Sequence, residues 1–274
     1  MANIIAVYSI KGGVGKTSLA FNLAAVSAMC AGHRTLLWDL DAQGSASFLC
    51  DEKGHGRAAK AIFDREVAPA KLITASPWPK LDMLGADPSL RAVERLLLDA
   101  AKPKRLLKIL QDLLPLYDHI ILDCPPGLSE LSDQVFKAAD LLIAPVLPTP
   151  LGLRALDQMT SYLAERGGKG PDVMPVISML DTRKSLHRAF LADHPDWPAI
   201  PQASSVEQMA VKRAPVQVFA RTSRPAEVMR AIWDAVEGRL QVDAKAERQK
   251  ALRGRPRIPS PSRSSRSRDQ LGEV

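Results

Sequence analysis

The segment from Lys11 to Thr17 reads KGGVGKT, and it combines the residue types that hold a phosphate group. Glycines let backbone N–H groups curl around phosphate oxygens, and the two lysines supply positive charge. The segment follows an apolar run at residues 4–10 and precedes a helix-compatible segment at residues 18–31. In this context the positive end of the helix dipole faces the bound anion. These residues and their spacing therefore predict the phosphate-binding loop of a nucleotide site.

The polar residues of the loop have separate expected roles. Lys16 would contact the β- and γ-phosphates of ATP, and the Thr17 hydroxyl would ligate Mg²⁺. The general pattern G-x-x-x-x-G-K-[ST] requires a glycine where this chain has Ile10, and Lys11 is an additional lysine at the front of the loop. The residues expected to bind the nucleotide here are Lys11, Gly12, Gly13, Val14, Gly15, Lys16, Thr17 and Ser18.

Two acidic motifs follow other apolar runs. The stretch WDLDAQGS holds Asp39 and Asp41 two residues apart, so on a strand both carboxylates would point to one face. A solvated or helix-capping role is the alternative for this pair. The stretch IILDCPPG places Asp123 at the end of an apolar run, as a Walker B residue that supports Mg²⁺. The prolines and glycine after Asp123 force a sharp exit from the strand, and such a turn can sense the γ-phosphate.

Apolar runs alternate with segments of helical periodicity along most of the chain. Strands are expected at residues 4–10, 35–40, 81–85, 119–122, 141–147 and 173–180. Helices are expected at residues 18–31, 89–101, 104–114, 128–139, 153–166 and 225–240. The alternation predicts an α/β P-loop NTPase fold, with a mostly parallel central sheet and helices on both faces. The three polar motifs would then converge at the carboxyl ends of the strands.

The composition excludes several classes of protein. With 274 residues, 46% of them hydrophobic, the chain can bury a large globular core. The aromatic share of 5% argues against base-stacking platforms for single strands. No apolar stretch reaches transmembrane length and no signal peptide is evident, so a cytoplasmic location is expected. Neither the three cysteines nor the five histidines show metal-ligand spacing, and the histidines are expected to be ordinary surface or core residues.

The net charge of +7 is concentrated near the C-terminus. Residues 244–274 contain nine basic and three acidic residues, so this segment carries +6 and residues 1–243 carry about +1. Gly, Pro, Ser and Arg dominate it, which predicts a disordered basic tail (244–274) after a P-loop ATPase domain (1–243). Residues 244–252 could instead continue the last helix. The RGRPR stretch looks like an AT-hook core for the minor groove of A/T-rich DNA, although so short a match in an Arg-rich segment can arise by chance. Its basic residues are Arg253, Arg255 and Arg257.

The three motifs, in this order, resemble the ParA/MinD family of deviant Walker-A ATPases, and most closely ParA-type partition ATPases that lack an N-terminal helix-turn-helix. The resemblance covers most of residues 1–240, and the segments PTPLGLRAL and 200–208 fit it more loosely. It implies a homodimer that forms on ATP, with slow hydrolysis until a partner stimulates it. Lys11 would reach the partner subunit's phosphates, and Asp41 would position the attacking water. Asp39 and Asp123 would support Mg²⁺.

The resemblance also implies partners. Pro201 would lie near adenine, and a DNA-facing surface would include Lys212, Arg213, Arg221 and Arg224, with Arg230 close by. Such a surface, together with the tail, would bind DNA non-specifically and associate with the nucleoid. A ParB-like or other cargo-adaptor protein would stimulate hydrolysis. Membrane docking is not expected, because Gly, Pro and Ser interrupt the tail where the MinD branch has a continuous apolar face.

The chain also departs from the family pattern, and other functions remain open. Ala42 stands where the family commonly has proline, and Asp181 where asparagine is frequent. The alternatives are a P-loop ATPase that positions a protein complex without a DNA role, and an architectural DNA-binding protein that uses ATP structurally. A nitrogenase-reductase-like carrier would need paired bridging cysteines, and a tyrosine-kinase variant would need a Tyr-rich tail. Neither feature is present in the sequence.

Overall fold

The computed structural model describes residues 2–51, 58–98, 104–166 and 170–253. The chain divides into two units, Met1–Leu240 and Gln241–Val274. The part of the predicted tail up to Arg253 is helical, as the sequence allowed. Arg255 and Arg257 lie outside the described residues, and so does the rest of the predicted tail.

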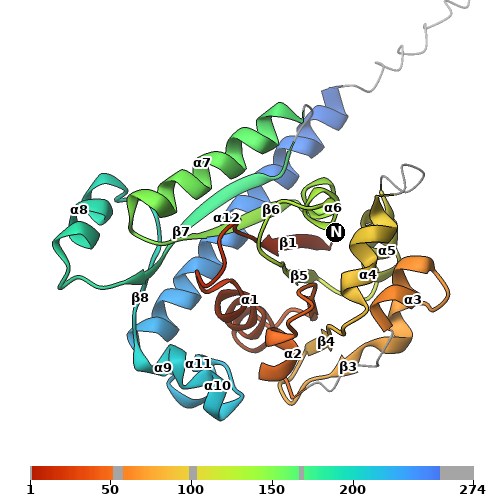
Figure 1. Ribbon diagram of the computed structural model, residues 1–274, viewed down its shortest axis with the longest axis horizontal. Helices are drawn as coiled ribbons and strands as arrows, with labels where there is room; N and C mark the ends of the chain where they lie inside the picture. Colours follow the sequence, from red (N-terminus) through yellow and green to blue (C-terminus); the bar gives the residue numbers. More distant parts are fainter. Residues whose placement is uncertain (1, 52–57, 99–103, 167–169, 254–274) are drawn as a thin grey trace, which may run out of the picture. The chain divides into compact units, whose positions relative to one another are not determined.

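A central sheet of eight strands organises the first unit, in the order β3-β4-β2-β5-β1-β6-β7-β8 (Figure 1). The strands are β1 (Asn3–Val7), β2 (Thr35–Asp39), β3 (Thr74–Ala75), β4 (Leu81–Leu84), β5 (His119–Asp123), β6 (Leu141–Val146), β7 (Asp172–Leu180) and β8 (Ala199–Pro201). Only the short β3 pairs antiparallel, with β4, and the other neighbours are parallel. The mostly parallel α/β fold predicted from the sequence is therefore confirmed.

The helices include short ones beside the six predicted. They are α1 (Lys16–Ala25), continued by the π-helical η1 (Val26–Cys30), α2 (Ser45–Leu49), α3 (Ala58–Asp64), the 3₁₀ turn η2 (Pro69–Leu72), α4 (Leu90–Leu97), α5 (Arg105–Leu113), α6 (Glu130–Ala138), α7 (Pro150–Glu165), α8 (Ser185–Asp193), α9 (Ser204–Glu207), α10 (Met209–Lys212), α11 (Val216–Phe219) and α12 (Arg224–Arg253). No helix of the described segments is both long and apolar enough to cross a membrane.

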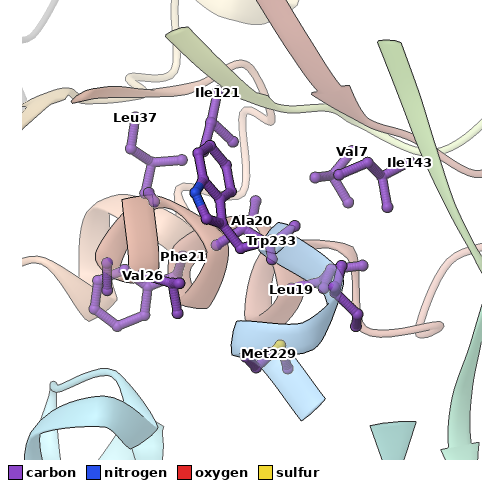
Figure 2. Close-up of a cluster of buried hydrophobic side chains, with 14 of the residues drawn as sticks. Val7, Leu19, Ala20, Phe21, Val26, Leu37, Ile121, Ile143, Met229 and Trp233 are labelled. Atoms are coloured by element: carbon purple, nitrogen blue, oxygen red, sulfur yellow. The ribbon is translucent and has the colours of Figure 1, made fainter. Parts of the chain in front are cut away.

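Side chains from alternate strand positions build a separate core on each face of the sheet. In β1, Ile5 and Val7 join the core beneath α1 and α12, whereas Ile4 and Ala6 join the core beneath α3 to α6. Figure 2 shows the first core, in which the strand residues Val7, Leu37, Ile121 and Ile143 lie above α1 and α12. Because a strand alternates its faces, one apolar run supplies both cores. Helices thus cover both faces, as predicted.

The predicted first strand ends earlier than its apolar run. Residues 4–10 were expected to be extended, but β1 stops at Val7 and residues 8–10 begin the loop that follows. The chain must leave the sheet there to form the tight turn before α1. Buried loop residues and buried strand residues have the same apolar composition, so hydrophobicity alone could not separate them.

Gly152 holds the first turn of α7 against the end of β6. A Cβ atom at this position would lie 2.1 Å from the carbonyl oxygen of Leu147, a backbone atom that cannot move freely. We expect Gly152→Ala to lower the free energy of unfolding by roughly 2–4 kcal/mol, measured by urea denaturation of the nucleotide-free protein. Gly238→Ala is the matched control, because a Cβ on this residue of α12 meets nothing within 4 Å. An unchanged midpoint for Gly152→Ala would contradict the prediction.

Candidate functional site

The loop between β1 and α1 adopts the conformation that a phosphate cradle needs. Gly13 (φ 72°) and Gly15 (φ 88°) have left-handed backbones, which glycine adopts without strain. Gly15 is the N-cap of α1, so the first N–H groups of the helix open toward the loop. A Cβ on Gly15 would also lie 3.1 Å from the Ser178 hydroxyl oxygen. Glycine is therefore required at the point where the loop enters the helix.

The two lysines of the loop have different environments. Lys16 is 7% exposed, and its ammonium donates a hydrogen bond of 3.0 Å to the carbonyl oxygen of Lys11 across the loop. Burial lowers the pKa of Lys16, and the nearby carboxylates of Asp123 and Asp41 partly offset this. Lys11 is half-buried, and its ammonium has no hydrogen-bond or ion-pair partner within the described part of the chain.

Two aspartates end neighbouring strands beneath the loop. Asp39 is the last residue of β2 and Asp123 the last of β5, and the two are register partners. Asp123 is 1% exposed, and among the described residues neither of its carboxylate oxygens has a hydrogen-bond partner. Burial raises the pKa of Asp123 well above its usual range, and Asp39 raises it further. The Thr17 hydroxyl, which lies close to this carboxylate although it forms no hydrogen bond of standard geometry with it, and the Lys16 ammonium both act to lower the pKa.

These observations test whether the site fits a divalent cation. A buried carboxylate without hydrogen-bond partners is costly, and a bound cation removes that cost. Mg²⁺ prefers oxygen ligands, usually one or two from protein together with phosphate and water. Asp123 and Thr17 supply such oxygens beside the loop. The residues therefore fit Mg²⁺ bound together with a nucleotide.

The carboxylate of Asp39 is already engaged within the protein. One oxygen accepts hydrogen bonds from the backbone N–H (2.9 Å) and the hydroxyl (2.8 Å) of Ser47, and the other accepts one from the Asp41 N–H (3.1 Å). Burial raises its pKa to about 6, although the bonds from Ser47 limit the rise. Asp39 thus ties α2 and the acidic turn to the sheet, and its role at Mg²⁺ stays a prediction.

Asp41 lies on the turn after β2, not on the strand itself. The expectation that strand alternation would align it with Asp39 was wrong, because β2 ends at Asp39. Asp41 accepts a hydrogen bond of 2.9 Å from the Gln43 N–H and remains half-buried. It nevertheless lines a cavity together with residues of the phosphate loop.

A cavity of about 790 Å³ opens over the loop, which is a volume typical of ligand sites. Its walls come from the loop, from the turn and helix after β2, from Pro126 and from the α9–α10 segment. Of the predicted nucleotide residues, the lining includes Gly12, Gly13, Gly15, Lys16, Thr17 and Ser18. The side chain of Val14 is buried instead, and Lys11, Asp39 and Asp123 are outside the lining. An adjoining space of about 90 Å³ has Gly15, Ser18 and Pro201 among its lining residues, so Pro201 lies near the loop, and its contact with adenine stays a prediction.

Several contacts that shape the site were not predicted from the sequence. The Tyr8 hydroxyl donates to the carbonyl oxygen of Gly127 (2.8 Å), and the Gly127 N–H donates to the carbonyl oxygen of Ile10 (3.0 Å). These bonds join the turn after Asp123 to the front of the phosphate loop. Asn22 of α1 accepts a hydrogen bond of 3.0 Å from the Val216 N–H, which fixes α11 to α1. No local pattern in the sequence indicates pairs so far apart along the chain.

Four of the predicted basic residues of the first unit are exposed, but some are neutralised; they are Lys212, Arg213, Arg221 and Arg224. Arg213 forms an ion pair with Asp51, and its guanidinium lies 4.6 Å above the Phe48 ring of α2. Arg224 pairs with Glu227 at 3.2 Å. Lys212 lies over the Phe219 ring at 5.5 Å, and Arg221 is exposed. Arg230 is half-buried and donates to Gln217 (2.7 Å), so it serves the packing of α11 against α12.

The arrangement of loop, cavity and strand ends is that of a P-loop nucleotide-binding protein. Residues 2–166 match the family model AAA_31, described as an AAA domain. The chain belongs to the ParA/MinD family of P-loop ATPases. The family resemblance seen in its motifs is thereby confirmed.

Related proteins show how far this similarity extends. The sporulation initiation inhibitor protein Soj of Bacillus subtilis is 31% identical over 245 residues, which cover 83% of this chain and 95% of Soj. The chromosome-partitioning ATPase Soj of Thermus thermophilus is 30% identical over 249 residues, which cover 86% of this chain and 96% of that protein. The Mg-ADP complex of the septum site-determining protein MinD of Pyrococcus horikoshii matches with a TM-score of 0.72 at 20% identity, covering 86% of this chain and 96% of MinD. This structure shows the same fold, in a protein that holds ADP with Mg²⁺.

Proposed function

We propose that this ATPase is a partition or positioning switch, in which ATP and Mg²⁺ join two copies, the dimer binds DNA non-specifically, and partner-stimulated hydrolysis releases it. The homology to partition ATPases supports the general role. One observation carries the dimer: the phosphate loop offers two lysines, but only Lys16 lines the cavity. Lys11 stands outside the lining, and no described residue pairs with its ammonium.

The positions of the two lysines suggest a division of labour. Lys16 is directed onto its own loop, where it would neutralise the β- and γ-phosphates of the same subunit. Lys11 would neutralise the phosphates of the second subunit. Two triphosphates facing each other carry many negative charges, so a lysine from each side stabilises the pair only while the γ-phosphate is present. Loss of that phosphate would weaken the dimer.

The acidic residues have distinct proposed tasks. Asp123 and Thr17 would hold Mg²⁺, which neutralises charge on the phosphate oxygens when bound. Asp41 faces the cavity and would position the attacking water. Asp39 would maintain the turn that carries Asp41, through its bonds to Ser47 and to the Asp41 N–H. Pro201 and Ser18 line the small adjoining space, where the base would lie.

The connection between nucleotide and DNA would run through a short stretch of chain. Val206 and Glu207 of α9 line the cavity, and Lys212 and Arg213 follow a few residues later on the surface. A nucleotide that alters the position of α9 would thereby move the basic surface. The proposed DNA contacts are Lys212, Arg213, Arg221 and Arg224, with Arg253, Arg255 and Arg257 near the C-terminus. Their positive charge would release counterions from DNA, so binding would be sensitive to salt.

DNA binding by the full-length protein tests this proposal. We expect the protein to bind a random-sequence duplex in the presence of Mg²⁺ and a non-hydrolysable ATP analogue. With ADP, the affinity for the same duplex should be lower by a factor of roughly ten or more, measured by fluorescence anisotropy. The double variant Lys212→Ala/Arg221→Ala should reduce the slope of log K against log salt by about 2, one for each lost phosphate contact.

A control pair with the same charge change separates local contacts from net charge. Lys71 and Lys108 are exposed lysines on η2 and α5, elements that pack against the other core, so Lys71→Ala/Lys108→Ala should leave the slope nearly unchanged. Equal affinity with ADP and ATP would contradict the proposal. ATP-dependent dimers that do not bind DNA would instead indicate a switch that positions a protein complex.

A further inference from the structure

Two histidines and a glutamate lie together at the edge of the sheet opposite the nucleotide cavity. His33 lies two residues before the start of β2, and His119 is the first residue of β5. Glu237 is on α12. One nitrogen of each histidine and one carboxylate oxygen of Glu237 lie within 4.8 Å of one another. The amino ends of β2 and β5 and the middle of α12 therefore meet at this cluster. The nucleotide site uses none of these three side chains.

Packing and hydrogen bonding hold the three side chains in place. His33 Nε2 is 2.6 Å from Glu237 Oε1, and the Trp233 indole N–H donates to the same oxygen at 3.0 Å. The rings of His33 and His119 meet edge to face with centroids 4.7 Å apart, and Trp233 meets His119 in the same manner at 5.1 Å. A neighbouring donor that orients a carboxylate is the usual outer support of a metal ligand.

The cluster is also accessible from solvent. His119 is buried, but the side chains of His33 and Glu237 are 34% and 30% exposed. An ion could enter from this side and keep a water molecule as a further ligand. The buried histidine would then form the inner wall of the site.

We infer that His33, His119 and Glu237 form a site for a transition-metal ion, of which Zn²⁺ is the ion that suits the ligands best. Two imidazoles and one carboxylate are a known three-residue ligand set for zinc, with water in the fourth position. Magnesium prefers oxygen ligands alone, so this site would not compete with the nucleotide site for its ion.

The distances are compatible with tetrahedral coordination after small side-chain rotations. Zinc bonds of about 2.0–2.2 Å place ligand atoms about 3.3–3.6 Å apart in a tetrahedron. The separations here, from 2.6 Å between His33 and Glu237 up to the 4.8 Å limit of the cluster, lie on both sides of that value. Adjustments on the order of 1 Å at two half-exposed side chains would bring the ligands into place.

A bound ion would fasten α12 to the sheet. Its ligands come from the segment before β2, from β5 and from α12, which are far apart in the chain. On the same helix, Met229 and Trp233 pack in the core beneath α1 (Figure 2), so the ion would also support α1, the helix that follows the phosphate loop. Because the ion binds the folded protein, it would stabilise that state.

Cobalt(II) titration of the full-length protein, without an affinity tag and with excess Mg²⁺, tests the inference. We expect one equivalent of Co²⁺ to give the intense visible absorption of a four-coordinate site, and one equivalent of Zn²⁺ to abolish it. At about a hundredfold excess over its dissociation constant, Zn²⁺ should raise the Tm by several degrees. Either no stoichiometric binding or octahedral cobalt spectra would overturn the inference, and the cluster would then be a hydrogen-bonded pair beside a packed ring.

Three variants assign the binding to these residues. His33→Ala removes a half-exposed ligand, and Glu237→Gln removes the charge but keeps an oxygen that can accept from Trp233. Each should weaken Co²⁺ binding at least tenfold while the metal-free protein keeps its fold by circular dichroism. His194→Ala is the control, because His194 is half-buried and stacks on Trp197 (4.1 Å) away from the cluster. Unchanged cobalt binding in both ligand variants would refute the assignment.

Discussion

Replacing Lys11 with alanine is expected to abolish ATP-dependent dimerisation while ATP binding to the monomer stays within about tenfold of wild type. The reason is the position of the two lysines: Lys16 lines the cavity, and Lys11 is outside the lining. Removing Lys11 leaves the phosphates of one subunit with their own lysine, backbone N–H groups and Mg²⁺. The facing charges of two nucleotides would then lose their cross-subunit compensation, and charge-assisted contacts of this kind are among the strongest in proteins.

Two measurements are needed: the mass of the protein in solution and its affinity for nucleotide. Light scattering after size exclusion, with Mg²⁺ and a non-hydrolysable ATP analogue, gives the mass, and a fluorescent nucleotide gives the monomer affinity. Lys16→Ala is the contrasting variant, because it should lose nucleotide affinity itself. Lys71→Ala removes an exposed lysine of η2 and should behave as wild type. A Lys11→Ala protein that dimerises with unchanged affinity would refute the proposed switch.

The parts of the site that the sequence predicted are those that depend on local chain geometry. The phosphate loop is contiguous, so its glycines, lysines and threonine reveal the turn without knowledge of distant residues. Asp39 and Asp123 were also expected to converge, because parallel strands bring their carboxyl ends to one edge, and the two are register partners in the sheet. Composition does not show at which residue the chain leaves a strand. For this reason Asp41 was expected on the strand with Asp39, whereas it lies on the turn after β2.

Other parts depend on side chains that meet only after folding. Tyr8 reaches Gly127, Arg213 reaches Asp51, and Asn22 reaches Val216, with no periodic pattern linking either member to its partner. The histidines show the same limit. Sequence spacing indicates no metal ligands because His33 and His119 are far apart, yet β2 and β5 are neighbours and bring them together. The short β3, β8, α2 and α9 to α11 were not predicted, because tertiary contacts and not propensity stabilise elements of two to five residues. The longer α3 and α8 were also missed.

Asp123→Asn is expected to change stability and activity in opposite directions. Burial and Asp39 raise the pKa of Asp123 well above its usual range. In the nucleotide-free protein, the buried carboxyl group is therefore most favourable to folding when it is protonated, below the unfolded-state pKa of about 3.9. As the pH rises through the folded-state pKa, this carboxyl group ionises and the free energy of unfolding falls. Asparagine cannot ionise, so at pH 8 the variant should be more stable than wild type by roughly 1–3 kcal/mol, with a flatter dependence of unfolding free energy on pH.

The same substitution should lower the rate of ATP hydrolysis by a factor of about 10³, because an amide no longer supplies the negative oxygen that Mg²⁺ needs beside Thr17. Urea denaturation at a series of pH values above the unfolded-state pKa and phosphate release with Mg-ATP are the two measurements. Asp234→Asn, on an exposed residue of α12, should alter neither. A variant that is less stable than wild type at high pH would show that the charge of Asp123 is balanced by Lys16 in the nucleotide-free protein. In that case the carboxylate would not be held ready for a cation, and the magnesium assignment would lose its structural support.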